Sequence, residues 1–367
     1  MRTSLCDTAG IEYPIVAFTP SEHVAAAVSR AGGLGVLGCV RFNDAAELDA
    51  TLDWMDANTG GKPYGVDVVM PSKVPTEGSA GDLSKHIPAE HRGFVERTLH
   101  ELGVPELTES EDGAGVLGWL HSVARSHVDV ALKHPIALIA NALGSPPADV
   151  IEQAHQHDVK VAALAGKAEH AVSHADNGVD IVIAQGYEAG GHTGEIASMV
   201  LLPEVVDAVG DRTPVLAAGG IGSGRQIAAA LALGASGVWM GSYWLTTSEY
   251  LETMRGSAAV QDALVAAGSS DTVRTRIYSG KPARLLKTRW TEAWARQDAP
   301  DPLPMPLQNL LVAQAHQRIA AAKDTSVVAM PVGQIVGRMN AVRPVAELMS
   351  ELVADYDQAL DRLDKTR

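Results

Sequence analysis

Short apolar runs alternate with amphipathic helical stretches through the first 240 or so residues of the chain. Each run reads as a buried strand, and glycine, proline or a capping residue separates it from the next helix. The eight expected strands cover residues 14–18, 34–40, 64–70, 136–142, 160–165, 180–185, 214–218 and 237–241. Helices are expected between them, for example after Ser21 and Asn43 as N-terminal caps.

The expected strands are continuous apolar runs, as strands buried on both faces require. Strands that alternate with helices predict a parallel sheet with right-handed crossovers. Eight such units in about 240 residues fit a closed barrel better than an open sheet. The sequence therefore predicts an α/β protein with a (β/α)8 TIM barrel.

Two parts of the chain depart from this rhythm. Residues 71–133 carry several prolines and glycines and two helical stretches, near 89–103 and 114–133, which suit either an elaborated third crossover or a lid. Beyond residue 248 the alternation stops. The predicted organisation is a barrel over 1–248 with an insertion at 71–133, a small subdomain over 249–325, and a C-terminal helical segment, 326–367, that returns to the barrel.

Composition narrows the class of protein. The formal net charge is −15 and no basic stripe is present, which argues against a nucleic-acid partner. The two cysteines, Cys6 and Cys39, form no CxxC pair, and no HExxH spacing occurs, so no metal site is expected. No apolar run approaches the roughly 20 residues that span a bilayer, and the N-terminus does not resemble a signal peptide. We expect a cytoplasmic protein without membrane contact, whose apolar surfaces permit but do not require a homodimer.

Two glycine-rich turns end the last two predicted strands, at 217–224 and 239–242. Glycine lets a backbone approach a phosphate and point several N–H groups at it, and the start of the following helix adds favourable partial charge. Barrel enzymes commonly bind phosphate at the loops after strands seven and eight. Either turn alone is weak support, because tight turns need glycine anyway, but together they predict a phosphate-bearing ligand.

A third glycine-rich segment follows the sixth strand. Residues 186–194 contain four glycines and include His192, which has little to pack against locally. An imidazole in such a position is expected to be open to a ligand and to exchange protons near neutral pH. His192 is therefore the predicted catalytic residue.

The run from Gln185 to Gly194 matches the QGxEAGGHxG signature of the nitronate monooxygenases, formerly called 2-nitropropane dioxygenases, at every fixed position. Residues 25–35, the two phosphate turns, 271–284 and Gly333-Gln334 resemble further parts of that family and of its relatives, the FMN-dependent enoyl reductases. The resemblance covers most of the chain and is thinnest over 71–135.

This resemblance implies a non-covalent FMN on the barrel rim. Its phosphate would meet Gly220, Gly241 and Ser242, with Gly219 and Met240 beside them. The ring would meet Gln185, Gly190 and Gly191, and it would lie over the first strand end, Ala17-Phe18-Thr19. Lys167, at the end of the fifth strand, would either stabilise negative charge near the ring or remain a surface lysine.

Two positions depart from the family pattern. The first strand ends in Ala17-Phe18-Thr19 where the family usually has Pro-Met, and Asp67 stands where the third strand usually offers Asn to the flavin. An ionised Asp only accepts hydrogen bonds, whereas Asn also donates them. A carboxylate there would disfavour negative charge on the reduced ring.

The resemblance implies FMN-dependent oxidation of alkyl nitronates with O2 to a carbonyl compound and nitrite, with His192 as base or substrate-binding group. Related carbon acids are further candidate substrates. The alternative is an NAD(P)H-dependent enoyl or acyl-thioester reductase on the same barrel.

Overall fold

The computed structural model describes residues 1–70, 83–107, 121–254 and 258–366, and within them eight parallel strands close into a barrel. The strand order around the barrel is β1-β2-β3-β4-β5-β6-β8-β9. The fold prediction is confirmed, and the fifth strand was placed to the residue. The strands are β1 Ile15–Thr19, β2 Leu34–Gly38, β3 Tyr64–Val68, β4 Leu138–Asn141, β5 Lys160–Ala165, β6 Ile181–Gln185, β8 Val215–Ala218 and β9 Gly237–Met240.

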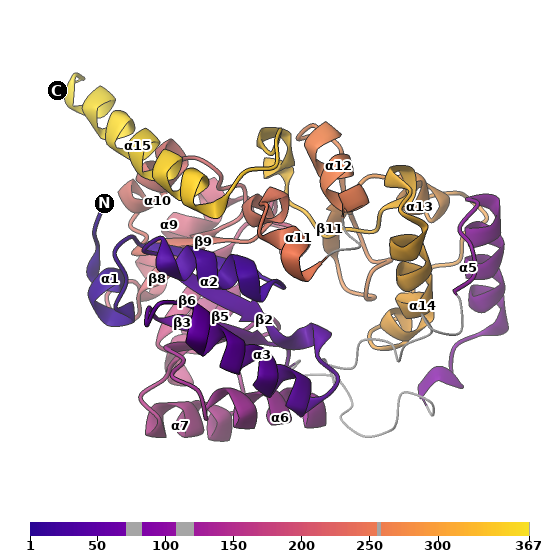
Figure 1. Cartoon of the computed structure of the whole chain (residues 1–367), viewed down its shortest axis with the longest axis horizontal. Coiled ribbons are helices and arrows are strands. Elements are labelled where there is room, and N and C mark those ends of the chain that lie inside the picture. Colours follow the sequence, from indigo (N-terminus) through magenta and orange to yellow (C-terminus); the bar gives the residue numbers. More distant parts are fainter. Residues whose placement is uncertain (71–82, 108–120, 255–257, 367) are drawn as a thin grey trace.

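Helices surround the strands in the left part of Figure 1. They are α2 Glu22–Arg30, α3 Ala45–Asn58, α6 His121–Ala131, α7 Ala148–Gln156, α8 Ala168–Asp176, α9 Ser198–Val209 and α10 Gly224–Ala232, with α1 Ser4–Ala9 before the first strand. The hydrophobic pattern did not single out α9, which carries Pro203 in its interior.

Local capping explains where two of these helices begin. The Ser21 hydroxyl accepts a hydrogen bond from the Val24 N–H at 3.3 Å, as predicted for the start of α2. The prediction of Asn43 as the cap of the next helix was wrong by one residue. Asp44 takes that place, and its carboxylate accepts from the Ala46 N–H at 2.9 Å because an extended backbone at Asp44 aims the side chain back at the first turn.

The barrel interior is filled by small and branched apolar side chains from alternate strand positions. The interior cluster joins inward-facing residues of seven strands, among them Val16, Val36, Ala140, Ile183 and Trp239. The intervening positions face the helices and pack in two outer clusters. This alternation decides which side chains reach the mouth of the barrel.

A second group of elements lies beside the barrel, to the right in Figure 1. It contains α5 Ala89–Glu101, α13 Arg289–Ala293, α14 Leu307–Ala322 and a three-stranded antiparallel sheet of order β10-β11-β7, with β10 Thr272–Thr275, β11 Ala283–Leu286 and β7 Gly191–His192. Its own apolar core unites Phe94, Trp290, Trp294, Leu311 and Ile319. The sheet therefore takes its third strand from the glycine-rich loop of the barrel.

The two helical stretches expected within 71–133 have different partners. Helix α5 packs against α14 in the second group, whereas α6 packs against α3 and β3 on the barrel. Residues 71–82 and the first part of the stretch expected over 114–133 lie outside the described residues. The predicted domain boundaries stay a prediction.

The last helix, α15 Val345–Asp364, runs back along α10 and α2. The approach to α10 is so close that a side-chain carbon at Gly224 would lie 2.1 Å from the Leu352 carbonyl oxygen. Two short helices, α11 Tyr250–Thr253 and α12 Ala258–Ala266, precede the sheet. Within the described parts of the chain, no helix combines the length and apolar character needed to cross a bilayer.

Candidate active site

Three of the predicted site residues occupy inward-facing positions at the carboxyl ends of barrel strands. Phe18 packs on the interior cluster, and its ring stacks on Trp239 with centroids 6.1 Å apart. Asp67 pairs with Gly38 and Ala140, and Gln185 pairs with Ala218, so each shares the inward face of its partner. Phe18 thus forms part of an apolar floor, with Asp67 and Gln185 as polar groups at its edge.

Gly38 is needed at this floor because a side chain there would collide with the Phe18 ring, with its first carbon 3.0 Å from Cε2. The Gln185 amide makes no hydrogen bond to any described residue, which leaves it free at the mouth. An unpartnered amide beside an aromatic floor is suited to a planar polar ligand.

Ala17, Thr19 and Met240 face away from the mouth. Ala17 and Met240 belong to the apolar layer between strands and helices. The buried Thr19 hydroxyl accepts from the Ser21 N–H at 3.1 Å and so shapes the turn into α2. Only the backbones of these three residues can serve a ligand at the mouth.

The turn after β8 has the form of an anion cradle. Gly219 and Gly220 have φ values of 102° and 69°, a left-handed region that strains other residues. The Gln226 side chain holds the turn, accepting from Gly222 N–H and the Ser223 hydroxyl and donating to the Gly220 carbonyl.

The backbone N–H groups of Gly220, Gly241 and Ser242 donate to no acceptor among the described residues. Strands β8 and β9 are neighbours, so these groups lie on adjacent turns of the rim. The Ser242 hydroxyl accepts from the Gly333 N–H at 2.9 Å, which ties a third glycine segment to the same place. Several free N–H groups on adjacent turns are the kind of hydrogen-bond donors that bind a phosphate.

The start of α10 contributes less than expected to this cradle. The Arg225 N–H donates to the Asp355 carboxylate at 3.0 Å, so α15 already satisfies part of that helix terminus. Backbone groups of the two turns, rather than the helix end, are the available donors.

The 186–194 loop is a fixed structure rather than a flexible one. A side-chain carbon at Gly190 would lie 2.6 Å from the Gly333 nitrogen, so only glycine allows this contact. The Glu188 carboxylate accepts from the Ser198 N–H at 3.1 Å, at the start of α9, and thus braces the loop rather than contacting His192.

Arg284 anchors the same loop from the second sheet. It is 3% exposed, donates to the Tyr187 carbonyl at 3.0 and 3.3 Å, and places its guanidinium 4.5 Å from the centre of the Tyr187 ring. In the sequence this segment is part of the family resemblance only, and no local pattern predicts its contact with the loop.

His192 is held by residues that come 87 or more positions later in the chain. It pairs with Ala283 across β7 and β11, and its Nε2 lies 2.6 Å from the Oγ of the fully buried Ser279. The Lys281 N–H also donates to that Oγ, at 3.3 Å. The other ring nitrogen, Nδ1, has no hydrogen-bond partner among the described residues.

Burial lowers the pKa of His192 to about 4, and the nearby Lys281 charge acts in the same direction. The expectation of proton exchange near neutral pH was therefore wrong. The loop sequence offered no sign of this, because the groups around His192, among them Ser279 and the Tyr278 ring at 6.4 Å, come from a distant part of the chain.

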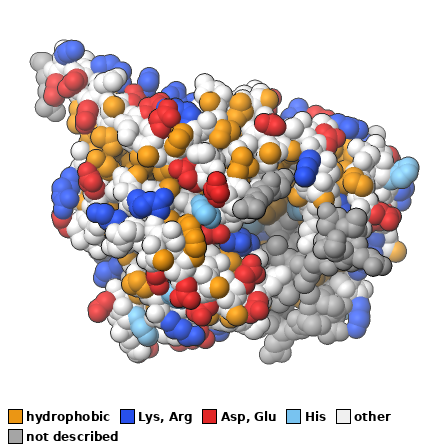
Figure 2. Space-filling view, viewed as in Figure 1, with side chains coloured by type: hydrophobic (Ala, Val, Ile, Leu, Met, Phe, Trp, Pro, Cys, Tyr) orange, Lys and Arg blue, Asp and Glu red, His pale blue; other side chains and the backbone are white. Residues whose placement is uncertain are grey.

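Lys167 is exposed at the first position before α8, and no contact ties it to the other candidates. Figure 2 shows a hollow on one face between the barrel and the second group of elements, with acidic and basic side chains mixed around it.

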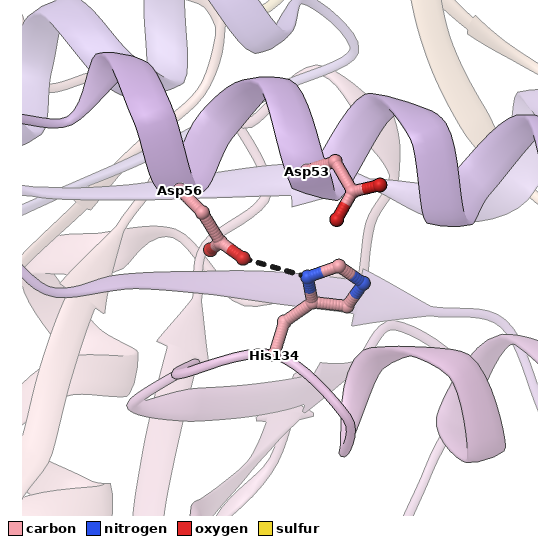
Figure 3. Close-up of side chains that lie close together, drawn as sticks. All are labelled: Asp53, Asp56 and His134. Atoms are coloured by element: carbon pink, nitrogen blue, oxygen red, sulfur yellow. Dashed lines mark hydrogen bonds and ion pairs between the residues drawn. The ribbon is translucent and has the colours of Figure 1, made fainter.

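A separate polar cluster lies away from the barrel mouth, where α3 meets the turn before β4 (Figure 3). His134 Nδ1 lies 2.8 Å from Asp56 and its Nε2 3.2 Å from Asp49, while Asp53 completes a group of potential metal ligands. Asp49 and Asp56 thus hold the largely buried His134 ring between α3 and the turn before β4, a structural role that spacing alone did not specify.

Comparisons with known proteins agree with this geometry. The family model for nitronate monooxygenase matches residues 2–355. The Mycobacterium tuberculosis protein named "Putative monooxygenase Rv1533" is 50% identical, over 99% of this chain and 98% of its own length.

Solved structures extend the likeness. A nitroalkane oxidase from Streptomyces ansochromogenes has a TM-score of 0.81 and 28% identity, covering 98% of this chain and all of its own. FabK from Thermotoga maritima has a TM-score of 0.75 and 25% identity, with full coverage of both chains. The family implies a flavin cofactor, and the free N–H groups and unpartnered amide at the barrel mouth fit one. The chain is an oxidoreductase that belongs to the nitronate monooxygenase family.

Proposed function

We propose that the protein binds FMN at the barrel mouth and oxidises alkyl nitronates with O2 to a carbonyl compound and nitrite. The observation that carries this proposal is the placement of His192, which Ser279 fixes on a rigid loop beside the two glycine turns. A purely structural loop would not need a half-buried imidazole with one nitrogen free.

The chain's own groups would hold FMN in three places. Backbone N–H groups of Gly220, Gly241 and Ser242 would surround the phosphate, with Gly219 and Met240 beside them. Gln185 and the glycine pair Gly190-Gly191 would meet the ring, and Phe18, between the backbones of Ala17 and Thr19, would lie under it. Lys167 at the rim would add positive charge. When bound, FMN supplies the redox chemistry with O2, and the protein supplies binding, orientation and electrostatics.

The state of His192 favours a nitronate over the neutral nitroalkane. With a pKa of about 4, its imidazole is a weaker base than free imidazole, so it is poorly suited to taking a proton from carbon. A neutral imidazole still donates one N–H to a nitronate oxygen. The Lys281 charge that depresses the His192 pKa also attracts an anionic substrate.

Anaerobic mixing of the FMN-loaded protein with propionate 3-nitronate, NADH and NADPH in parallel tests this function. We expect the nitronate to bleach the flavin absorbance faster than either nicotinamide. His192→Asn should lose most of this reaction while FMN stays bound, and the same change at the exposed His170 of α8 should leave it intact.

Rapid bleaching by NADH or NADPH with no response to nitronate would favour the reductase alternative. Undiminished turnover by His192→Asn would remove His192 from the mechanism. A wild-type protein that binds no FMN would refute the proposed function as a whole.

A further inference from the structure

Asp67 is an acidic residue on the inward face of the barrel, where its neighbours are apolar. It is 3% exposed and lies between Gly38 and Ala140 in the register of β2, β3 and β4. The residues on either side of it, Val66 and Val68, face the outer apolar cluster. Its carboxyl group therefore points into the barrel mouth beside Phe18.

No described residue offers a hydrogen bond to this carboxyl group. The amide of Asn141, on the neighbouring strand β4, donates both of its N–H groups to other acceptors, the Met70 and Gly144 carbonyls. The Cys39 thiol donates to the Leu37 carbonyl. An ionised carboxylate without donors or a positive partner is costly to bury, whereas a neutral carboxyl group is not.

We propose that Asp67 stays protonated and donates its carboxyl proton as a hydrogen bond to an acceptor atom of the bound flavin ring. This inference rests on the proposed FMN site. A protonated Asp67 offers the donor that the family's Asn offers at this position, so the substitution preserves the hydrogen bond instead of opposing negative charge on the ring.

The surroundings of Asp67 agree with this protonation state. Burial alone raises the pKa of Asp67 well above its usual range. Cys39, the residue after β2, has a thiol whose pKa is also raised, chiefly by burial. The Arg41 charge lowers the Cys39 pKa in part. Strands β1 and β4 contribute Phe18, Ala140 and Asn141 to this part of the barrel, and none of these residues carries a charge.

The first test needs no cofactor. Infrared difference spectra of the FMN-free protein at pH 7, wild type minus Asp67→Asn, should contain the C=O stretching band of a protonated carboxyl group. Asp207→Asn, the same change at an exposed position of α9, should give no such band. A carboxylate signal in place of the carboxyl band would overturn the proposal.

The second test measures FMN affinity by fluorescence quenching at pH 7. Asp67→Asn keeps a donor and should bind FMN within about twofold of wild type, whereas Asp67→Val should bind roughly 3- to 10-fold more weakly, the size of one neutral hydrogen bond. Asp67→Ala serves as a second donor-free variant should valine disturb the strand, and melting temperatures report whether each variant is folded.

The outcomes separate the two proposals. If wild type binds FMN and the donor-free variants bind it equally well, the role of Asp67 is refuted and the flavin site stands. If wild type does not bind FMN, the flavin site falls and the hydrogen bond to the ring falls with it.

Discussion

Replacing Arg284 by methionine should release the loop over residues 186–194 from the second sheet. Methionine keeps an unbranched apolar stem but removes two hydrogen bonds to the Tyr187 carbonyl, one of 3.1 Å to the Thr272 hydroxyl, and the contact with the Tyr187 ring. It also leaves the Tyr187 carbonyl without its charged donor.

The magnitude follows from these contacts. Hydrogen bonds to a charged group each contribute about 1.5–3 kcal/mol. Part of this loss is offset, because methionine, unlike the guanidinium, does not have to lose a charged group's hydration when it is buried. We expect a net loss of about 3 kcal/mol, which is roughly a 100-fold rise in the open population of the loop. The barrel strands should be unaffected, because Arg284 joins the loop to β10 and β11 only.

Hydrogen exchange followed by mass spectrometry checks this expectation peptide by peptide. Peptides over residues 186–196 should exchange much faster in Arg284→Met, and peptides from β4 and β5 should not. Arg212→Met, which removes an exposed ion pair to Asp176, is the matched control and should change neither. Equal acceleration in the loop and the barrel strands, or none in the loop, would refute the reasoning.

Three further outcomes follow from the site. Gly190→Ala should abolish turnover, measured as nitrite release, because the added carbon would lie 2.6 Å from the Gly333 nitrogen and must displace the loop; retained activity would contradict this. The rate constant kcat/KM should stay level from neutral pH to about pH 5 and fall towards pH 4, since His192 remains neutral until its lowered pKa is reached; a midpoint near 6.5 would count against the lowered pKa of His192. Glu188→Ala should lower the melting temperature by a few degrees, because losing the hydrogen bond to the Ser198 N–H reduces the free energy of unfolding by about 1 kcal/mol. An unchanged melting curve would show that this hydrogen bond adds no stability.

The barrel could be predicted from the sequence because each strand is marked by a local run of apolar residues. Residues 160–165 form an apolar run between a polar turn and Gly166, and they form β5 unchanged. The rim turns after β8 and β9 could be predicted for a similar reason, since Gly219 and Gly241 directly follow such apolar runs, whereas their role in binding phosphate stays a prediction.

The residues that surround His192 could not be predicted from the sequence in the same way. Its hydrogen bond to Ser279 joins residues 87 positions apart, and the strand that creates this contact, β7, has only two residues and so has no periodicity. The pKa of His192 depends on this packing with distant residues, which the sequence of the loop alone does not predict. Asp67 was visible as an acid in an apolar run, but the lack of donors around it emerges only from the register of three strands.

The shared sheet β10-β11-β7 also has a consequence for synthesis and divergence. The ribosome completes β9 at Met240 well before Ser279, Ala283 and Arg284 emerge, so the rim turns can form while the His192 loop still lacks its partners. The barrel strands and their rim turns are therefore made before the residues that hold the His192 loop. The same separation places Ser279 and Ala283, which orient His192, outside the eight barrel strands, so substitutions at these two positions can shift His192 without altering a barrel strand.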